Sequence, residues 1–491
     1  MQDTQDLKLM LDSRVPLVVI ESYEENKVIN LLLRVAREKQ RSLHRWSVTD
    51  GMTRLGFGPQ LTPKEREYQD PSDALEHIKR QAEPGIYLFC DLHPYLGDQP
   101  HNVRLLKDIA LNHGAVPHAV VLLSHRLKLP PEIARYSASF ELSLPSDEQI
   151  MAIIREEATH YARQNDRERI KADPKTLRQL LACLQGLSRT DVRRLVRIAI
   201  WQDGAITRDD LPAVNKAKFA LMDMEGVMSF EYETSDFSQV AGLDNLKRWL
   251  AARSEVFRGQ DNGLEPPKGI LLLGIQGGGK SLAAKAVAGT WQLPLLRLDL
   301  GALYNKYHGE TERNLREALQ LADAMAPCVL WLDELEKALS QGGGDNGTSR
   351  RLLGTLLTWM AERKSRVFLT ATSNDISQLP PELIRKGRLD EIFFVDLPDA
   401  EVRQAIFEIH LRKRELDPAQ YDLERLAVAS EGFSGAEIEQ AVVAARYSAG
   451  YQGVSGAQLL EEIAGTSPLS VVMAEQLQQL RAWAAERTIP A

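Results

Sequence analysis

The stretch that decides the fold is Gly274-Ile275-Gln276-Gly277-Gly278-Gly279-Lys280-Ser281, which has the pattern G-x-x-x-x-G-K-S. An apolar run, 269–273, precedes it, and a run typical of a helix, 282–289, follows it. Glycines let backbone N–H groups turn toward an anion, and the N-terminus of the helix adds its dipole. The stretch therefore predicts a phosphate-binding loop, in which Lys280 reaches the β- and γ-phosphates of a nucleotide and Ser281 is a ligand for Mg²⁺. A glycine-rich surface turn is the alternative interpretation.

Two acidic residues end a later apolar segment. Residues 327–332 are typical of a buried parallel strand, and Asp333 and Glu334 follow them. We expect Asp333 to hold the Mg²⁺ shell and Glu334 to polarise the attacking water. Another apolar run, 367–372, leads to Asn374, whose amide is expected to hydrogen-bond the γ-phosphate and the water. Read alone, Asn374 is equally consistent with a turn.

Two arginines, Arg385 and Arg388, lie shortly before the last apolar run, 392–395. A guanidinium group stabilises the charge that spreads over a transferring phosphoryl group. The pair is therefore a candidate to complete the nucleotide site of a neighbouring subunit. A basic surface turn is the favoured interpretation when this segment is read alone.

Together these segments resemble the AAA family of ring-forming ATPases, from Phe237 to about Tyr447. The resemblance implies a P-loop α/β module with a parallel five-stranded sheet flanked by helices, a C-terminal helical lid, ATP and Mg²⁺ as ligands, and hexamers in which the arginines act in trans. It implies a pore loop at Lys306, Tyr307, His308 and Gly309. The residues that it implies in nucleotide binding are Ala241, Gly242, Gly274, Ile275, Gln276, Gly277, Gly278, Gly279, Lys280, Ser281, Leu282, Ile406, His410, Gly435 and Ala436.

Nearly the whole chain is similar to one poorly characterised AAA group, of the hypothetical chloroplast open reading frame type, which also occurs in cyanobacteria and other bacteria. The two share the sequence Gly-Ile-Gln-Gly in the phosphate loop, the run 379–388 and a first half without nucleotide motifs. The family usually has prolines at Ile275 and Gln276 and a threonine at Gly278. Since glycine enlarges the flexible ensemble, we expect a loop that binds nucleotide with modest affinity.

The first two hundred residues contain segments similar to segments of the second half, but they lack the nucleotide-binding motifs. Acidic residues at 21–25 stand where a phosphate loop would be, and an anionic loop repels phosphate. Asp91 matches Asp333, and Ser124 is placed where Asn374 stands. The similar segments are 129–133 with 379–383, 140–145 with 394–398, and 186–192 with 432–438. We predict an internal duplication whose first copy is a degenerate AAA-like α/β module with its own small helical lid.

These observations set the expected domain boundaries. The degenerate module covers 1–145, its helical lid 146–205, a linker 206–235, the large ATPase subdomain 236–400, and the second lid with C-terminal helices 401–491.

Composition narrows the class of protein. The chain of 491 residues is 44% hydrophobic and 26% charged, with a net charge of -8, which is ordinary for a globular protein and gives no support for nucleic-acid binding. No apolar run approaches the length that spans a membrane, and three cysteines fit a reducing compartment. We expect location in the cytoplasm, or in the plastid stroma if the chain is plastid-encoded.

The sequence thus predicts an ATP-hydrolysing AAA protein that assembles with copies of itself and remodels an unidentified protein target through its pore loop. The alternative is a nucleotide-dependent scaffold or switch that recruits a partner without threading it.

Overall fold

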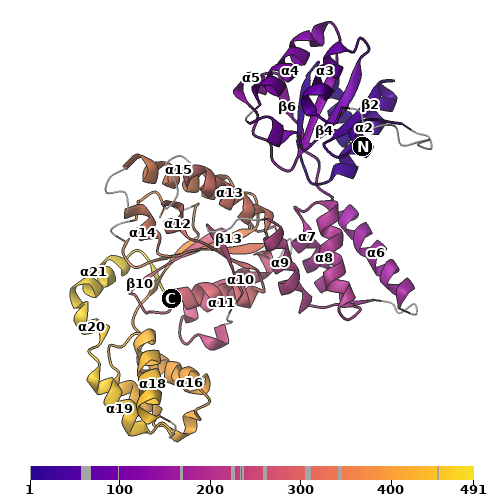
Figure 1. Cartoon of the computed structure of the whole chain (residues 1–491). Coiled ribbons are helices and arrows are strands. Elements are labelled where there is room, and N and C mark those ends of the chain that lie inside the picture. Colours follow the sequence, from indigo (N-terminus) through magenta and orange to yellow (C-terminus); the bar gives the residue numbers. More distant parts are fainter. Residues whose placement is uncertain are drawn as a thin grey trace. The chain divides into compact units, whose positions relative to one another are not determined.

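A computed structural model gives the fold of the chain (Figure 1). It describes residues 2–56, 68–97, 99–165, 170–222, 227–232, 234, 237–257, 263–304, 311–340, 346–376, 379–383, 385, 387–450 and 453–491. The chain divides into two compact units. One contains 1–146 with 188–191, and the other contains 147–187 with 192–491. In the described part of the chain, no helix is both long enough and apolar enough to cross a membrane.

The first unit is built on a six-stranded sheet covered on both faces. Its strand order is β3 (Gly51–Leu55), β2 (Ser42–Ser47), β4 (Gly85–Cys90), β5 (Ala119–Ser124), β1 (Leu17–Glu21) and β6 (Ser137–Ser139). All pairings are parallel except that of β3 with β2. Val18 and Ile20 face α1 (Gln2–Asp12) and α2 (Glu25–Glu38). Leu17 and Val19 face α3 (Pro71–Arg80) and α4 (Pro100–Leu111), as expected for strands buried on both sides.

Three short elements complete the first unit. They are the helical turns η1 (His93–Tyr95) and η2 (Asn112–Gly114), and helix α5 (Pro131–Ala134). The turn η1 follows β4 directly, so it lies at the carboxyl edge of the sheet.

A bundle of four helices follows: α6 (Asp147–Gln164), α7 (Pro174–Leu184), α8 (Arg189–Trp201) and α9 (Asp210–Leu221). Two short strands, β7 (Lys171–Ala172) and β8 (Ala205–Ile206), pair beside them. Buried aliphatic side chains from all four helices form one core, which includes Ile154, Leu180, Val196 and Val214. Helix α9 and strand β9 (Met228–Glu231) both lie within the stretch 206–235.

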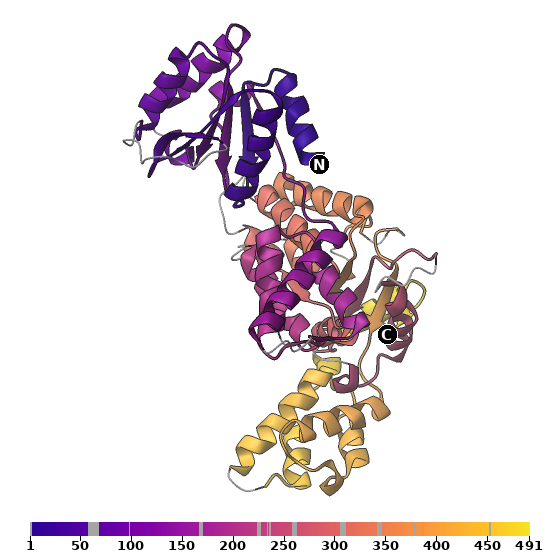
Figure 2. The ribbon, with the colours of Figure 1, turned by 90° about the vertical axis from the view of Figure 1, so that its right-hand side faces the viewer.

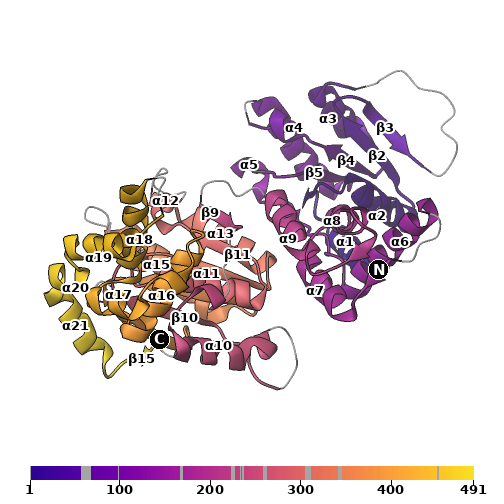
Figure 3. The same ribbon diagram turned by 90° about the horizontal axis from the view of Figure 1, so that it is seen from below.

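The second large sheet has seven strands. Their order is β15 (Ile489–Pro490), β14 (Glu391–Val395), β10 (Gly269–Gly274), β13 (Val367–Ser373), β12 (Cys328–Leu332), β11 (Leu295–Leu298) and β9. The five central strands are parallel, which confirms the predicted sheet, while β9 is antiparallel to β11. The added edge strand β15 is parallel to β14 and brings the C-terminal residues beside α10 (Asp244–Phe257) (Figure 3).

Helices cover both faces of this sheet as well. Helix α10 and α11 (Lys280–Trp291) pack on the face that carries Leu272 and Phe368. The opposite face, which carries Leu271 and Leu330, packs against α12 (Leu300–Tyr304), α13 (Thr311–Ala324), α14 (Leu335–Ser340) and α15 (Asn346–Glu362). A short turn, η3 (Phe237–Gln239), precedes α10.

The two sheets share one topology. In the first sheet the five parallel strands lie in the order β6-β1-β5-β4-β2, and in the second they lie in the order β14-β10-β13-β12-β11. If these five strands are counted along the chain within each module, both orders place the fifth strand first, followed by the first, fourth, third and second. An antiparallel strand lies beyond the same edge in both, β3 in one and β9 in the other. The shared order of the five central strands supports the predicted duplication, whereas the edge strands differ, because β3 follows β2 along the chain and β9 precedes β10.

One sequence correspondence between the modules is corrected by the structure. Ser124 Oγ donates to Asp91 Oδ1 at 3.4 Å, as Thr372 Oγ1 donates to Asp333 Oδ1 at 2.8 Å. The strand registers agree, because Cys90 pairs with Leu123 and Leu332 pairs with Ala371. Ser124 therefore corresponds to Thr372, and its predicted match with Asn374 is wrong by two positions.

The second lid is a separate group of helices after the sheet (Figure 2). It contains α16 (Ala400–Arg412), the turn η5 (Pro418–Gln420), α17 (Leu423–Ala429), α18 (Gly435–Ala449) and α19 (Gly456–Gly465), around a core that includes Phe407 and Val442. After α20 (Leu469–Val472), helix α21 (Ala474–Ala484) returns to the sheet module, where Leu477 joins its core and Arg481 pairs with Asp396 at 2.9 Å.

Candidate nucleotide-binding site

The phosphate loop joins β10 to α11. Gly279 caps the helix with φ of +93°, and Gly277 has φ of +79°, both in the left-handed region that favours glycine. A Cβ atom on Gly277 would lie 3.0 Å from Ser434 Oγ, so the lid packs closely on the loop. The lid also bonds the loop directly, because Ala436 N donates to Gly277 O at 3.2 Å. The start of α18 is therefore in direct contact with the loop.

Lys280 is a buried cation at the start of α11. Its Nζ donates to Gly274 O at 2.8 Å and to Ile275 O at 2.6 Å. Burial lowers the pKa of Lys280 to about 8, although the nearby carboxylates of Glu336, Asp333 and Glu334 act in the opposite direction. The side chain is thus held where the loop, the helix and the acidic strand end converge.

The acidic strand end is organised by a threonine from the neighbouring strand. Thr372 Oγ1 donates to Asp333 Oδ1 at 2.8 Å and accepts from Glu334 N at 3.0 Å. Arg297, on β11, donates to Asp333 Oδ2 at 3.0 Å, and its guanidinium lies over the Trp331 ring. Both carboxylate oxygens of Asp333 therefore have protein donors, and its orientation is fixed.

Glu334 and Asn374 are each held by a charged neighbour. Glu334 has φ of +48°, a left-handed conformation that is costly for a residue with a Cβ and that recurs at functional sites. Lys337 Nζ donates to Glu334 Oε2 at 2.6 Å. The buried Glu336 accepts from both N and Nδ2 of Asn374, at 3.1 Å and 3.0 Å. This pair fixes the amide of Asn374 beside the acidic strand end.

A pocket of about 550 Å³ lies between the carboxyl edge of the sheet and the lid. Its lid side includes Ile406 and His410. His410 Nδ1 lies 3.5 Å from Glu439 Oε1; burial lowers the pKa of His410, and Glu439 opposes that shift. The residues of the β15 edge, Pro490 and Ala491, also line the pocket. Loop, acids and lid thus enclose a single space large enough for a nucleotide.

The structure brings most predicted site residues to this pocket. The predicted residues that line it are Ala241, Gly242, Gln276, Gly277, Gly278, Gly279, Lys280, Ser281, Leu282, Asp333, Glu334, Asn374, Ile406, His410, Gly435 and Ala436. Gly274 and Ile275 do not line it: Gly274 is inside β10, and Ile275 is buried in the core. They reach the site only through the carbonyl groups that bind Lys280.

The remaining predicted residues lie elsewhere. Arg385 and Arg388 do not line the pocket of their own chain, and Arg388 Nη1 donates to Glu382 O. The predicted pore loop at 306–309 lies outside the described residues. Four residues that organise the site were not predicted from the sequence: Thr372, Arg297, Glu336 and Lys337. For Thr372 a signal existed, since it is a hydroxyl residue near the end of β13, two positions before Asn374.

The oxygen donors of the pocket fit Mg²⁺. Ser281 supplies a hydroxyl and Asp333 a carboxylate, which are hard oxygen groups of the kind that this ion prefers. Because Thr372 and Arg297 already occupy the carboxylate oxygens of Asp333, that residue is suited to contact the water shell that Mg²⁺ retains.

Comparisons with known proteins agree with the fold. Residues 270–397 match the ATPase family associated with various cellular activities (AAA), 3–142 match the N-terminal domain of SpoVK-like AAA ATPases, and 148–225 match their second domain. A parallel sheet whose strand β10 leads into a G-x-x-x-x-G-K-S loop, followed by a helical lid, defines a P-loop module. The chain belongs to the AAA ATPase family.

Several full-length relatives are similar to the whole chain. One is an uncharacterized AAA domain-containing protein, ycf46, of Pyropia yezoensis, 35% identical over 99% of this chain and 98% of the relative. The protein of the same description from Guillardia theta is 34% identical over 99% and 95%. The proteasome-activating nucleotidase of Aeropyrum pernix is 40% identical over 43% of this chain and 54% of its own length. The predicted resemblance to the AAA family, and to its plastid-type group, is confirmed.

Proposed function

We propose that this chain binds and hydrolyses ATP with Mg²⁺ in the pocket between sheet and lid. The observation that carries the proposal is the convergence on one pocket of the buried Lys280, the pair Asp333 and Glu334, and the lid residue Ala436. Backbone N–H groups of the loop and Lys280 hold the phosphates. When bound, Mg²⁺ neutralises charge on the β- and γ-phosphates.

The residues at the carboxyl ends of the strands have different roles in the proposed reaction. Glu334 accepts a proton from the attacking water and orients it, and its φ of +48° directs this residue out of the line of β12. To Asn374, whose amide is held by Glu336, we assign a hydrogen bond to the γ-phosphate. Release of the γ-phosphate changes what the loop contacts, and the bond from Ala436 to Gly277 passes that change to the lid.

We further propose that the chain assembles with copies of itself into a ring, taken to be a hexamer, in which Arg385 and Arg388 complete a neighbour's site. Lid movement would then act on a protein target through the predicted pore loop, Lys306–Gly309. The work would take place in the cytoplasm, or in the plastid stroma for a plastid-encoded chain. No basic stripe supports nucleic acid as the target.

The decisive experiment replaces Glu334 by Gln. Glu334→Gln keeps the size and hydrogen-bonding capacity of the side chain but cannot accept the proton, so we expect ATP binding to persist and turnover to fall by at least about a hundredfold. The exposed Glu424→Gln on α17 is the matched control and should keep full turnover. Unchanged hydrolysis in Glu334→Gln would refute the proposed site.

A second experiment separates a remodelling protein from a nucleotide-dependent switch. The Glu334→Gln protein, held in its ATP form, serves as bait to recover the target. Tyr307→Ala is then assayed for target processing and for ATP hydrolysis. Loss of processing with intact hydrolysis supports action through a pore loop, whereas full processing supports recruitment without threading.

A further inference from the structure

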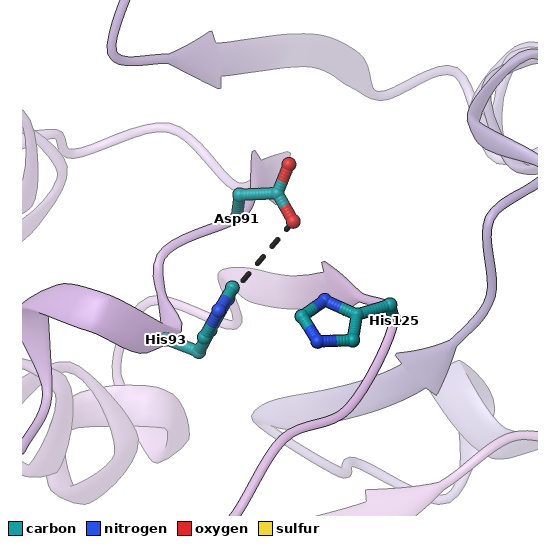
Figure 4. A group of neighbouring side chains, drawn as sticks. All are labelled: Asp91, His93 and His125. Atoms are coloured by element: carbon teal, nitrogen blue, oxygen red, sulfur yellow. Dashed lines mark ion pairs between the residues drawn. The ribbon is translucent and has the colours of Figure 1, made fainter. Parts of the chain in front are cut away.

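The degenerate module carries a cluster of metal-binding side chain types at the edge of its sheet. Asp91 directly follows β4, His93 begins η1, and His125 directly follows β5. Strands β4 and β5 are parallel neighbours, with Cys90 paired to Leu123, so their carboxyl ends meet. Figure 4 shows the three side chains turned toward one another at this edge. Ligands of open α/β sheets bind at this edge.

The distances between the possible ligand atoms are close to those found in a metal site. One ligand atom of each residue lies within 4.8 Å of the others, and Asp91 Oδ1 lies 3.9 Å from His93 Nδ1. Ligands at about 2.0 Å from a tetrahedral ion are roughly 3.3 Å apart, so small side-chain rotations close the difference. His125 and Asp91 are exposed, which gives their side chains room for that movement.

Neighbouring groups contact all three side chains. Ser124 Oγ lies 2.7 Å from His93 Nδ1 and 3.4 Å from Asp91 Oδ1. The Tyr23 ring stacks on His125, with centroids 5.8 Å apart. Asp91 has φ of +55°, a left-handed conformation for a residue with a Cβ. In metal sites the ring nitrogen that does not bind the ion makes a hydrogen bond to a neighbouring group, so His93 would keep its bond to Ser124 through Nδ1 and bind the ion through Nε2.

The position of the cluster matches that of the hydrolytic acids in the other module. Asp91 corresponds to Asp333, since each ends the same strand of its sheet and accepts from a hydroxyl on the next. The first copy has acids where the second has its phosphate loop, and it adds two imidazoles at this edge. Nitrogen donors favour Zn²⁺ and related transition-metal ions over Mg²⁺, which prefers oxygen.

We propose that Asp91, His93 and His125 bind a divalent transition-metal ion, with Zn²⁺ as the best fit to two imidazoles and one carboxylate. Three protein ligands leave one position of a tetrahedral ion open to water or to a side chain of a partner. The site lies wholly in the module that lacks nucleotide motifs and is independent of the proposed ATPase activity.

The test is a titration of the metal-stripped full-length chain with Zn²⁺ in the absence of nucleotide. We expect about one Zn²⁺ per chain, and at least about tenfold weaker binding in His93→Ala and in His125→Ala. His101→Ala, an exposed histidine of the same module, is the matched control and should bind as the wild type does. Asp333→Asn should also bind normally, since it alters only the nucleotide pocket.

Co²⁺ supplies a readout that does not depend on variants. The wild-type chain with Co²⁺ should show the intense visible absorption of a four-coordinate ion, and excess Zn²⁺ should abolish it. Equal unfolding temperatures of the wild type and both histidine variants in a chelator would show that the variants fold. Absence of bound Zn²⁺, or equal affinity in His93→Ala, His125→Ala and His101→Ala, would overturn the proposal and leave an ordinary ion pair between Asp91 and His93.

Discussion

At the scale of single residues, Thr372 joins the two acids that the proposed chemistry needs. Its hydroxyl donates to Asp333 and accepts from the backbone of Glu334, so one side chain sets the position of both. Thr372→Val keeps the volume and removes both hydrogen bonds. Since each bond is worth about 1 kcal/mol, the two together are worth about 2 kcal/mol, and we expect kcat for ATP to fall by roughly thirtyfold with little change in nucleotide affinity.

The same strand offers the control for Thr372. Thr370 is buried two positions earlier, and its hydroxyl has no hydrogen-bond partner within the described part of the chain. Thr370→Val should therefore leave turnover unchanged. Steady-state ATPase assays of both variants provide the comparison, and an equal loss in the two would show that packing, not the hydroxyl of Thr372, is responsible.

We predict that Lys280 makes nucleotide binding sensitive to pH. Burial lowers its pKa to about 8, so the ammonium loses its proton as the pH rises through that value, where an ordinary lysine stays charged. A neutral amine does not pair with phosphate, and affinity is therefore present below this pKa and lost above it. From about pH 7 to about pH 9 we expect the Kd for ATP to rise about tenfold. Equilibrium binding across this range measures it, and a flat profile would contradict the assignment of Lys280.

At the scale of elements, the sequence predicted best where one local pattern determines the structure. The loop 274–281 and four of the central parallel strands, β10, β12, β13 and β14, were predicted correctly because continuous apolar runs and a glycine pattern are local signals. The fifth, β11, was expected only through the five-stranded sheet that the family resemblance implies. Strands β9 and β15 were not predicted, since they have 4 and 2 residues and exist only through pairing with distant β11 and β14. The hydrogen bonds around Asp333 likewise depend on which strands become neighbours.

Helix α9 escaped prediction for a different reason. Its buried face includes Asn215 and Lys218 as well as Leu211 and Val214, so polar residues interrupt the apolar period. Lys218 is fully buried, and its Nζ donates to Cys183 O and Gln185 O, both at 2.8 Å. It thus supplies donors to carbonyl groups that the C-terminus of α7 leaves unpaired.

This arrangement predicts the effect of replacing Lys218. Lys218→Met keeps much of the volume but leaves both carbonyl groups buried without their donor, which should lower the free energy of unfolding by about 1–3 kcal/mol. The exposed Lys175→Met on α7 should have little effect. Urea unfolding followed by circular dichroism tests the pair, and equal midpoints would show that the ammonium group does not stabilise the bundle.

At the scale of the whole molecule, the placement of the arginines leads to a prediction about assembly. Glu334 lines the nucleotide pocket of its own chain, and Arg388 does not. In an active site built between two subunits, one chain would therefore supply Glu334 and its neighbour would supply Arg388. Arg388→Ala should bind ATP normally and hydrolyse it poorly. Its control is Arg425→Ala, an exposed arginine of the lid.

Mixing two inactive variants tests this arrangement directly. Glu334→Gln supplies intact Arg388, and Arg388→Ala supplies intact Glu334, so a mixed ring contains some complete sites. With random mixing in equal amounts, about a quarter of the sites combine both residues across a head-to-tail interface, and about a quarter of wild-type turnover should return. Each variant alone should stay inactive at the same total concentration. If the mixture gains nothing although the chains exchange, or if wild-type turnover stays proportional to concentration down to a demonstrated monomer, Arg388 does not act on a neighbouring site.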